Sequence, residues 1–304
     1  MLLWSVFTQV LLPILVLFGL GWLLDRRARL DITTLVKLNI YLFVPAFMFV
    51  HVVDSHLGGA QAARIMGFTA TVIGSMFVFC ACIGRWRKYA PEQTRALQLA
   101  TMFYNSGNYG IPLMALAFPG LGPAMQVFIV LTQNISTFTV GLMLAASTQH
   151  TGWRVAVPML RQISLWAILA AFTVRLLDLP VQEVRWIWVP LQYISDSLVA
   201  FALVTLGVQL SQTPARQSLS RIGWALGLRL LVAPLIAVAL VPIFGFKGQE
   251  ATIMIVSSSF PTAVNTALIA HEFGADSQFA AAAVFYTTLF SMFTVTVLIA
   301  LLPA

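Results

Sequence analysis

The stretch YNSGNYGIPL, Tyr104–Leu113, lies inside an apolar run that is long enough to cross a membrane. It contains asparagines, glycines and a proline, each of which weakens a helix or carries a polar group that hydrocarbon does not solvate. Freed backbone groups are tolerated at membrane depth only where protein or water satisfies them. We therefore expect this stretch to face the protein interior or a water-filled cavity.

The composition of the chain is typical of a helical membrane protein. Of its 304 residues, 60% are hydrophobic and 9% are charged, whereas a soluble domain carries about 25% charged residues. Apolar runs of roughly twenty residues, the length that crosses a bilayer core, recur along the whole chain. The sequence therefore predicts an all-α polytopic membrane protein whose surface contacts membrane lipid.

Ten of these runs are predicted to be transmembrane spans. Short connections join them, so spans that follow one another in sequence are expected to be neighbours in space. The predicted spans are Trp4–Leu24, Leu35–Val53, Ala63–Ile83, Ala96–Phe118, Ala124–Ala146, Met159–Leu177, Ile187–Leu210, Ile222–Phe244, Ala251–His271 and Gln278–Leu302.

Basic residues in the connections predict the orientation. Those after the first, third, fifth and seventh spans are Arg26, Arg27, Arg29, Arg85, Arg87, Lys88, Arg95, Arg154, Arg161, Arg216 and Arg221. The other side holds Arg64, Arg185 and Lys247. Because positively charged loops stay in the cytoplasm, this bias places the odd-numbered connections inside and both termini outside. The net charge of +7 is explained in this way and predicts no nucleic-acid partner.

The chain divides into two halves at the basic connection Gly152–Gln162. With five spans on each side, residues 1–150 and 151–304 enter the membrane from opposite sides, as in an inverted repeat. The fourth span of the second half contains SSSFPTAVN, Ser257–Asn265, which is again a polar cluster around a proline. Two interrupted helices at equivalent places in two halves are the sequence pattern that best indicates a transporter's binding site.

Each interruption is expected to start a half-helix at its proline. Pro112 and Pro261 lack a backbone N–H, and as first residues of half-helices they would leave N-termini with unpaired N–H groups and partial positive charge. Two such N-termini directed at one point suit an anion, most simply a carboxylate. The predicted substrate-binding residues are Asn105, Asn108, Gly110, Pro112, Gln133, Asn134, Ser258, Pro261 and Asn265.

Simpler interpretations of these residues are left open. A lone proline kink is common in membrane helices, and Gly107 and Gly110 also fit close helix packing. Gln133 and Asn134 in the fifth span fit either a cavity wall or hydrogen bonds between helices. Asn39 in the second span is a further candidate for the cavity wall.

Two ionisable residues within the spans are candidates for energy coupling. Asp196 falls near the middle of the seventh span, and a carboxyl group removed from water favours its protonated form, which suits a proton carrier. The alternative is a structural ion pair between Asp196 and Arg229 in the eighth span, and Arg229 is also a candidate counter-charge for an anion. Sodium coupling would instead use oxygen side chains such as Ser257–Ser259 and Thr262. Passive uniport is the third option.

The motif NSGNYGIP, followed by small residues and by FPG, resembles the fourth-span motif of the auxin efflux carrier family. That family includes the plant PIN proteins and many bacterial organic-anion permeases, so the resemblance implies a bacterial inner-membrane transporter. It also implies a scaffold and a transport domain, spans 4 and 9 that cross at Pro112 and Pro261, and contact between Asn105 and the substrate. The chain lacks the long cytoplasmic loop of the plant carriers and the charged pair in their third span.

The predicted function is secondary active transport of small organic anions, with malonate or malate favoured over auxin-like aromatic carboxylates. An anion channel or uniporter is the alternative among transport proteins. A membrane enzyme is the alternative from another class, but the sequence has neither an HExxH nor a G-x-S-x-G motif. Cys80 and Cys82, two apart in one span, predict no metal site. We expect no catalytic residue, metal or cofactor, and a homodimer is left open.

Overall fold

The computed structural model describes residues 4, 7–55, 57–145, 163–213, 219–272 and 276–302. Within these ranges the regular structure is helical, and strand pairing is limited to one isolated bridge. The predicted central connection Gly152–Gln162 and the basic residues Arg154, Arg161 and Arg216 lie outside the described residues.

Six helices in the described part of the chain are long and apolar enough to cross a membrane by length and composition. They are Phe7–Ala28, Ile32–Val53, Gly59–Trp86, Arg185–Gln212, Ile222–Phe244 and Ser277–Leu301. A shorter apolar helix covers Ile163–Leu176. The chain is therefore a multi-pass, all-helical membrane protein.

Several of the predicted spans are divided into two or three helical elements. The described elements, in chain order, are η1 (Phe7–Leu11), α2 (Leu12–Ala28), α3 (Ile32–Leu38), η2 (Asn39–Phe43), α4 (Val44–Val53), α5 (Gly59–Trp86), α6 (Pro91–Met102), η3 (Ser106–Gly110), α7 (Ile111–Ala117), α8 (Leu121–Ser136), η4 (Thr137–Gly141), α9 (Leu142–Ala145), α11 (Ile163–Leu176), η6 (Val181–Glu183), α12 (Arg185–Gln212), α13 (Leu219–Gly227), η7 (Leu228–Val232), α14 (Ala233–Phe244), α15 (Gly248–Ser258), α16 (Val264–Glu272) and α17 (Ser277–Leu301).

Four of the π-helical turns precede a proline in the first turn of the next helix. These turns are η1, η2, η3 and η7, and the prolines that follow them are Pro13, Pro45, Pro112 and Pro234. A proline inside a helix removes one hydrogen bond, and its ring clashes with the carbonyl four residues earlier. The wider π-helical turn absorbs this mismatch, so the chain continues as a helix where a sharp break would otherwise be needed.

Helices α2 and α12 pack so closely that their backbones touch. A Cβ atom on Gly207 would lie 2.0 Å from the carbonyl oxygen of Phe18, and one on Gly21 would lie 2.1 Å from that of Val204. Only glycine fits such a contact, as is common between membrane helices. At the ends of both helices, Asp25 accepts hydrogen bonds from the Ser211 hydroxyl and, at 2.7 Å, from Gln212 Nε2.

The connection from α2 to α3 is held by Asp31, the N-cap residue of α3. Its carboxylate accepts from the Thr34 hydroxyl at 2.5 Å and from the backbone N–H groups of Thr33 and Thr34 at 3.0 and 3.2 Å. These hydrogen bonds, the Thr34 hydroxyl foremost, hold the pKa of Asp31 below its usual value. The helix start is therefore fixed by a charged cap.

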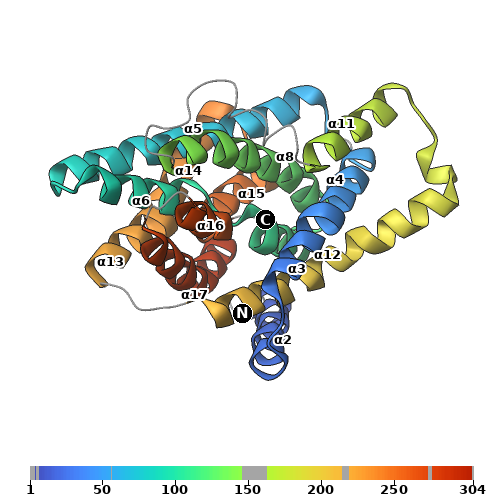
Figure 1. Cartoon of the computed structure of the whole chain (residues 1–304). Coiled ribbons are helices and arrows are strands. Elements are labelled where there is room, and N and C mark those ends of the chain that lie inside the picture. Colours follow the sequence, from blue (N-terminus) through green and yellow to red (C-terminus); the bar gives the residue numbers. More distant parts are fainter. Residues whose placement is uncertain are drawn as a thin grey trace.

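The helices pack most extensively in two groups. In the first group α12 contacts α2, α3 and α4, and α4 contacts α11; Figure 1 shows α12 running beside the blue N-terminal helices. In the second group α5 contacts α6, α8 and α14, and α17 contacts α13 and α16. Each group combines helices from both predicted halves of the chain. Much of the packing therefore joins helices that are far apart in sequence, in addition to the expected contacts between neighbouring spans.

Candidate functional site

The polar stretches in the fourth and ninth predicted spans are breaks in helices, and the two breaks pair with each other. Tyr104 and Thr262 form an isolated antiparallel bridge. The N–H of Asn105 donates to the carbonyl of Pro261 at 2.8 Å, and the N–H of Ala263 donates to that of Phe103 at 3.0 Å. The unwound backbone of each break thus satisfies the other, which is how polar backbone can persist at this depth.

The expectation that each proline begins a half-helix is wrong. After the first break the helix resumes at Ser106, and Pro112 follows in α7 behind the π-helical turn η3. After the second break α16 begins at Val264, and Pro261 lies within the break. The helices resume directly after the residues that pair between the breaks, and the π-helical turn η3 accommodates the missing N–H of Pro112.

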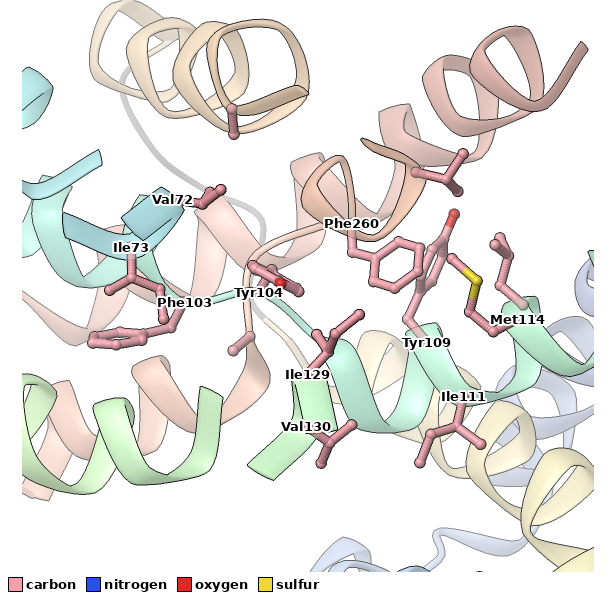
Figure 2. Close-up of a cluster of buried hydrophobic side chains, with 14 of the residues drawn as sticks. Val72, Ile73, Phe103, Tyr104, Tyr109, Ile111, Met114, Ile129, Val130 and Phe260 are labelled. Atoms are coloured by element: carbon pink, nitrogen blue, oxygen red, sulfur yellow. The ribbon is translucent and has the colours of Figure 1, made fainter. Parts of the chain in front are cut away.

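Aromatic rings and a buried amide pack around the paired breaks. The ring centre of Phe260 lies 6.1 Å from that of Tyr104 and 5.5 Å from that of Tyr109. Figure 2 shows these three side chains in the buried cluster. Gln126 of α8 is fully buried; its Nε2 donates to the Ser106 carbonyl at 2.7 Å, and its Oε1 accepts from the Ser257 hydroxyl at 3.2 Å. One glutamine side chain therefore links both broken helices.

Gly110 permits this arrangement by its lack of a side chain. A Cβ atom there would lie 2.5 Å from Gln126 Nε2 and 2.5 Å from the Phe260 ring. A Cβ on Gly107 would meet nothing within 4 Å, and Gly107 lines a cavity. The Gly-x-x-Gly spacing thus combines one packing position with one open position.

A cavity of about 390 Å³ lies against the paired breaks. Its walls come from α3, η2 and α4, from the breaks and η3, and from α8, η4, α11, α12 and α16. The lining residues are Val36, Asn39, Ile40, Tyr41, Val44, Tyr104, Asn105, Ser106, Gly107, Asn108, Val130, Gln133, Asn134, Thr137, Ile163, Ser164, Gln209, Ala263, Val264 and Asn265. The cavity therefore lies between the two packed groups of helices.

All five asparagines of the chain line this one cavity. Asn105, Asn108, Asn134 and Asn265 were predicted as binding residues and Asn39 as part of the wall. The amide groups of Gln133 and Gln209 join them. Asn39 Nδ2 donates to Asn108 Oδ1 at 2.5 Å, which connects the second span to the first break.

Four of these amides carry a buried polar atom that has no hydrogen-bond partner among the described residues. The atoms are Asn39 Oδ1, Asn105 Nδ2, Gln133 Nε2 and Gln209 Oε1, and each side chain is at most 7% exposed. A buried polar atom without a partner costs about 1–3 kcal/mol. Such atoms in a cavity wall indicate a site for a polar ligand or for water.

The other predicted binding residues lie behind the cavity wall. Pro112 is part of helix α7, and the Pro261 carbonyl is engaged by Asn105. The Ser258 hydroxyl donates to the Met254 carbonyl at 2.9 Å. With Gly110 these residues shape and support the breaks, and they are absent from the described lining.

The electrostatics of the cavity come from amides and helix ends. None of its described lining residues carries a charged side chain. Gly107 and Asn108 lie in the first turn after one break, and Val264 and Asn265 in the first turn after the other. First-turn N–H groups have no intrahelical acceptor and carry partial positive charge. The described wall of the cavity is thus free of charged side chains and includes two helix N-terminal turns.

Arg229 lies outside the cavity lining, behind Tyr104. Its side chain is fully buried, and its guanidinium carbon is 4.9 Å from the centre of the Tyr104 ring. Nη1 donates to the Thr101 carbonyl at 2.7 Å, and Nη2 donates to the Ser258 carbonyl. Of the two interpretations left open for Asp196, the structure does not support the ion pair with Arg229, because the guanidinium is held by these backbone carbonyls.

Asp196 lies on the exposed face of α12 and away from the cavity. His51 of α4 is within electrostatic range of Asp196 and of Asp54. The only short ion pair between described residues joins Arg64 Nη2 to Glu250 Oε2 at 3.1 Å. Asp196 therefore lies on a helix of the first group, α12, and outside the cavity lining.

Gln209 and Gln126 were missed by the sequence reasoning. Each is a glutamine within a predicted span, and a polar side chain in a span indicates an inward-facing position. Asn39 and Arg229, both named from the sequence, share a further signal, because each is a polar residue five or six positions before a proline that follows a π-helical turn.

Paired helix breaks beside a polar cavity in a multi-pass bundle are the features of a membrane transport protein. A family model described as "Membrane transport protein" matches residues 6–154 and 155–299, and the chain belongs to this family. It is the auxin efflux carrier family, to which the fourth-span motif pointed.

Relatives cover nearly the whole chain. An uncharacterized transporter of Methanothermobacter thermautotrophicus is 26% identical over 289 residues, which cover 94% of this chain and 95% of the relative. A Rhizobium meliloti protein named "Putative malonate transporter" is 26% identical over 314 residues, covering 97% and 95%. An uncharacterized transporter of Methanocaldococcus jannaschii is 24% identical over 302 residues, covering 93% and 94%.

Proposed function

We propose that this chain is a secondary active permease of small organic anions, with carboxylates such as malonate or malate as substrates. The observation that carries the proposal is the cavity at the paired breaks, whose buried amide donors find no partner within the described part of the chain. The name of the Rhizobium meliloti relative agrees with this substrate class. Charged carboxylate oxygens would accept hydrogen bonds from Asn105 Nδ2 and Gln133 Nε2.

The size of the cavity favours a small substrate. Its volume of about 390 Å³ is near the lower end of the ligand-site range of about 300–1,000 Å³. Seven of the twenty lining residues carry amide side chains, and these offer donors and acceptors to a short molecule with polar groups at both ends. We therefore favour small dicarboxylates over auxin-like aromatic carboxylates.

For the architecture we propose ten spans in two inverted repeats, residues 1–150 and 151–304, whose fourth helices cross at the breaks. The Tyr104–Thr262 bridge supports this arrangement, as does a cavity between two groups of helices that each combine both halves. Alternating access would then move one group against the other around the cavity.

The cavity lies near the helix ends that adjoin the odd-numbered connections. Ile163 begins α11, and Val36 and Gln209 lie within five residues of helix ends beside the first and seventh connections. The bias of basic residues supports a cytoplasmic location for these odd-numbered connections, with both termini outside. We propose that the protein lies in a bacterial inner membrane with this cavity on the cytoplasmic side.

The substrate class is tested by a thermal-shift and binding screen of the purified protein. We expect malonate, malate and other small dicarboxylates to stabilise the fold and to compete with one another, and indole-3-acetate to bind more weakly. Stabilisation specific to cations or to neutral sugars would contradict the proposal. In liposomes, flux that saturates with substrate distinguishes a carrier from a channel.

For energy coupling we propose that Asp196 carries a proton. It is the acid near the middle of α12, and His51 lies within electrostatic range of it. Asp196→Asn is then expected to leave downhill exchange intact but to make uptake insensitive to a pH gradient. Counterflow in liposomes with and without the gradient measures this, and Ser197→Ala, the next exposed position on α12, is the control. Uptake by Asp196→Asn that still follows the pH gradient would exclude Asp196 from the mechanism.

A further inference from the structure

Arg229 joins the C-terminal ends of two half-helices. Thr101 is the last residue but one of α6, and Ser258 is the last residue of α15. Their carbonyls accept hydrogen bonds from Nη1 and Nη2 of the same guanidinium. Because the last carbonyls of a helix have no intrahelical donor, Arg229 satisfies one such carbonyl at each of the two ends.

The positive charge of Arg229 balances the partial negative charges at the C-terminal ends of α6 and α15. The C-terminal end of a helix carries roughly half an elementary negative charge, so two converging ends carry roughly one. The single positive charge of Arg229 neutralises them, and the Tyr104 ring, 4.9 Å away, offers its negative face to the same group. The side chain is fully buried, so water does not compete for these contacts.

This is the place where a transported cation would bind if the chain used one. In transporters with broken helices, half-helix C-termini and unwound carbonyls coordinate the coupling ion. Here the two terminal carbonyls are already occupied. The guanidinium of Arg229 fills the space between these carbonyls, so a sodium ion at this point would have to displace a fixed positive charge.

We propose that Arg229 is a built-in cation that replaces a coupling sodium ion at the paired breaks, so that transport by this chain is independent of sodium. The inference rests on the proposed function, because it concerns how the same site is energised. A covalently attached charge does not dissociate during the cycle. Arg229 is therefore a positioning residue that holds α6 and α15 together with or without substrate.

The unmodified protein provides the first test. Carboxylate uptake into liposomes is expected to be the same in sodium, potassium and choline chloride, and sodium is expected to give no thermal stabilisation beyond that of potassium. Uptake that requires sodium, or stabilisation specific to sodium, would overturn the inference. Absence of carboxylate binding in every salt would instead count against the proposed function, and the thermal measurement still decides the role of Arg229.

The second test uses Arg229→Ala, which removes the guanidinium from between the ends of α6 and α15. We expect a lowered unfolding temperature that low millimolar guanidinium, or a high concentration of sodium, restores in part, because two helix ends are then left without a cation. Arg229→Lys should keep the sodium independence of the parent. The matched control is Arg175→Ala, since Arg175 also donates to a backbone carbonyl, that of Leu57 at 2.9 Å, but is only half-buried.

The control should show no recovery with either cation. Equal recovery of both variants, or none in Arg229→Ala, would mean that Arg229 does not fill a cation site. Should Arg229→Ala fail to accumulate, the comparison of salts on the parent protein decides the inference.

Discussion

Replacement of Asn105 by alanine should weaken carboxylate binding by roughly tenfold to more than a hundredfold. Asn105 is the last residue of the first break, its side chain is 6% exposed and lines the cavity, and its buried Nδ2 has no partner among the described residues. A hydrogen bond to a charged group contributes about 1.5–3 kcal/mol, which corresponds to this loss of affinity. Asn265→Ala, on the other break, should have an effect of the same kind.

Both variants should fold, because neither amide holds a helix in place. Binding of malonate is measured by calorimetry, and thermal unfolding without ligand is measured in parallel. Gln98→Ala is the matched control, since Gln98 is 4% exposed and donates to the Phe77 carbonyl at 3.3 Å but lies outside the cavity. Unchanged affinity in both asparagine variants would remove the breaks from the binding site.

Gly207→Ala should destabilise the protein by about 1–3 kcal/mol, the usual cost of overpacking, and larger residues should cost more. The added Cβ would lie 2.0 Å from the Phe18 carbonyl oxygen, so the backbones of α2 and α12 would have to separate. Side-chain rotation gives no relief, because both sides of this contact are backbone. Thermal unfolding in detergent measures the effect.

Gly19→Ala, on α2 as well, is the control for this change. A Cβ atom there would meet nothing within 4 Å, and alanine is favoured over glycine inside a helix by about 0.5–1 kcal/mol. We expect this variant to be as stable as the parent or slightly more stable. If both variants unfolded at the parent's temperature, α2 and α12 would not be in backbone contact in the membrane.

Hydrophobicity was enough to predict from the sequence that the chain is a membrane protein and where most of its helices lie. The bilayer core demands long apolar helices, so the apolar runs predicted α2, α5, α12 and α17 closely. The polar stretches after Tyr104 and Ser257 predicted interrupted helices for the same reason, since hydrocarbon tolerates polar backbone only when it is paired. The five asparagines were exceptional enough in these runs to be recognised individually.

What the tertiary structure decided is which of these groups meet. Local sequence suggested that the half-helices start at Pro112 and Pro261, but the helices resume at Ser106 and Val264, because the two breaks pair with each other. The partners of Arg229 are carbonyls far from it in sequence, and Asp196 is not among them. A side chain's partner depends on long-range packing, on which hydropathy and spacing carry no information.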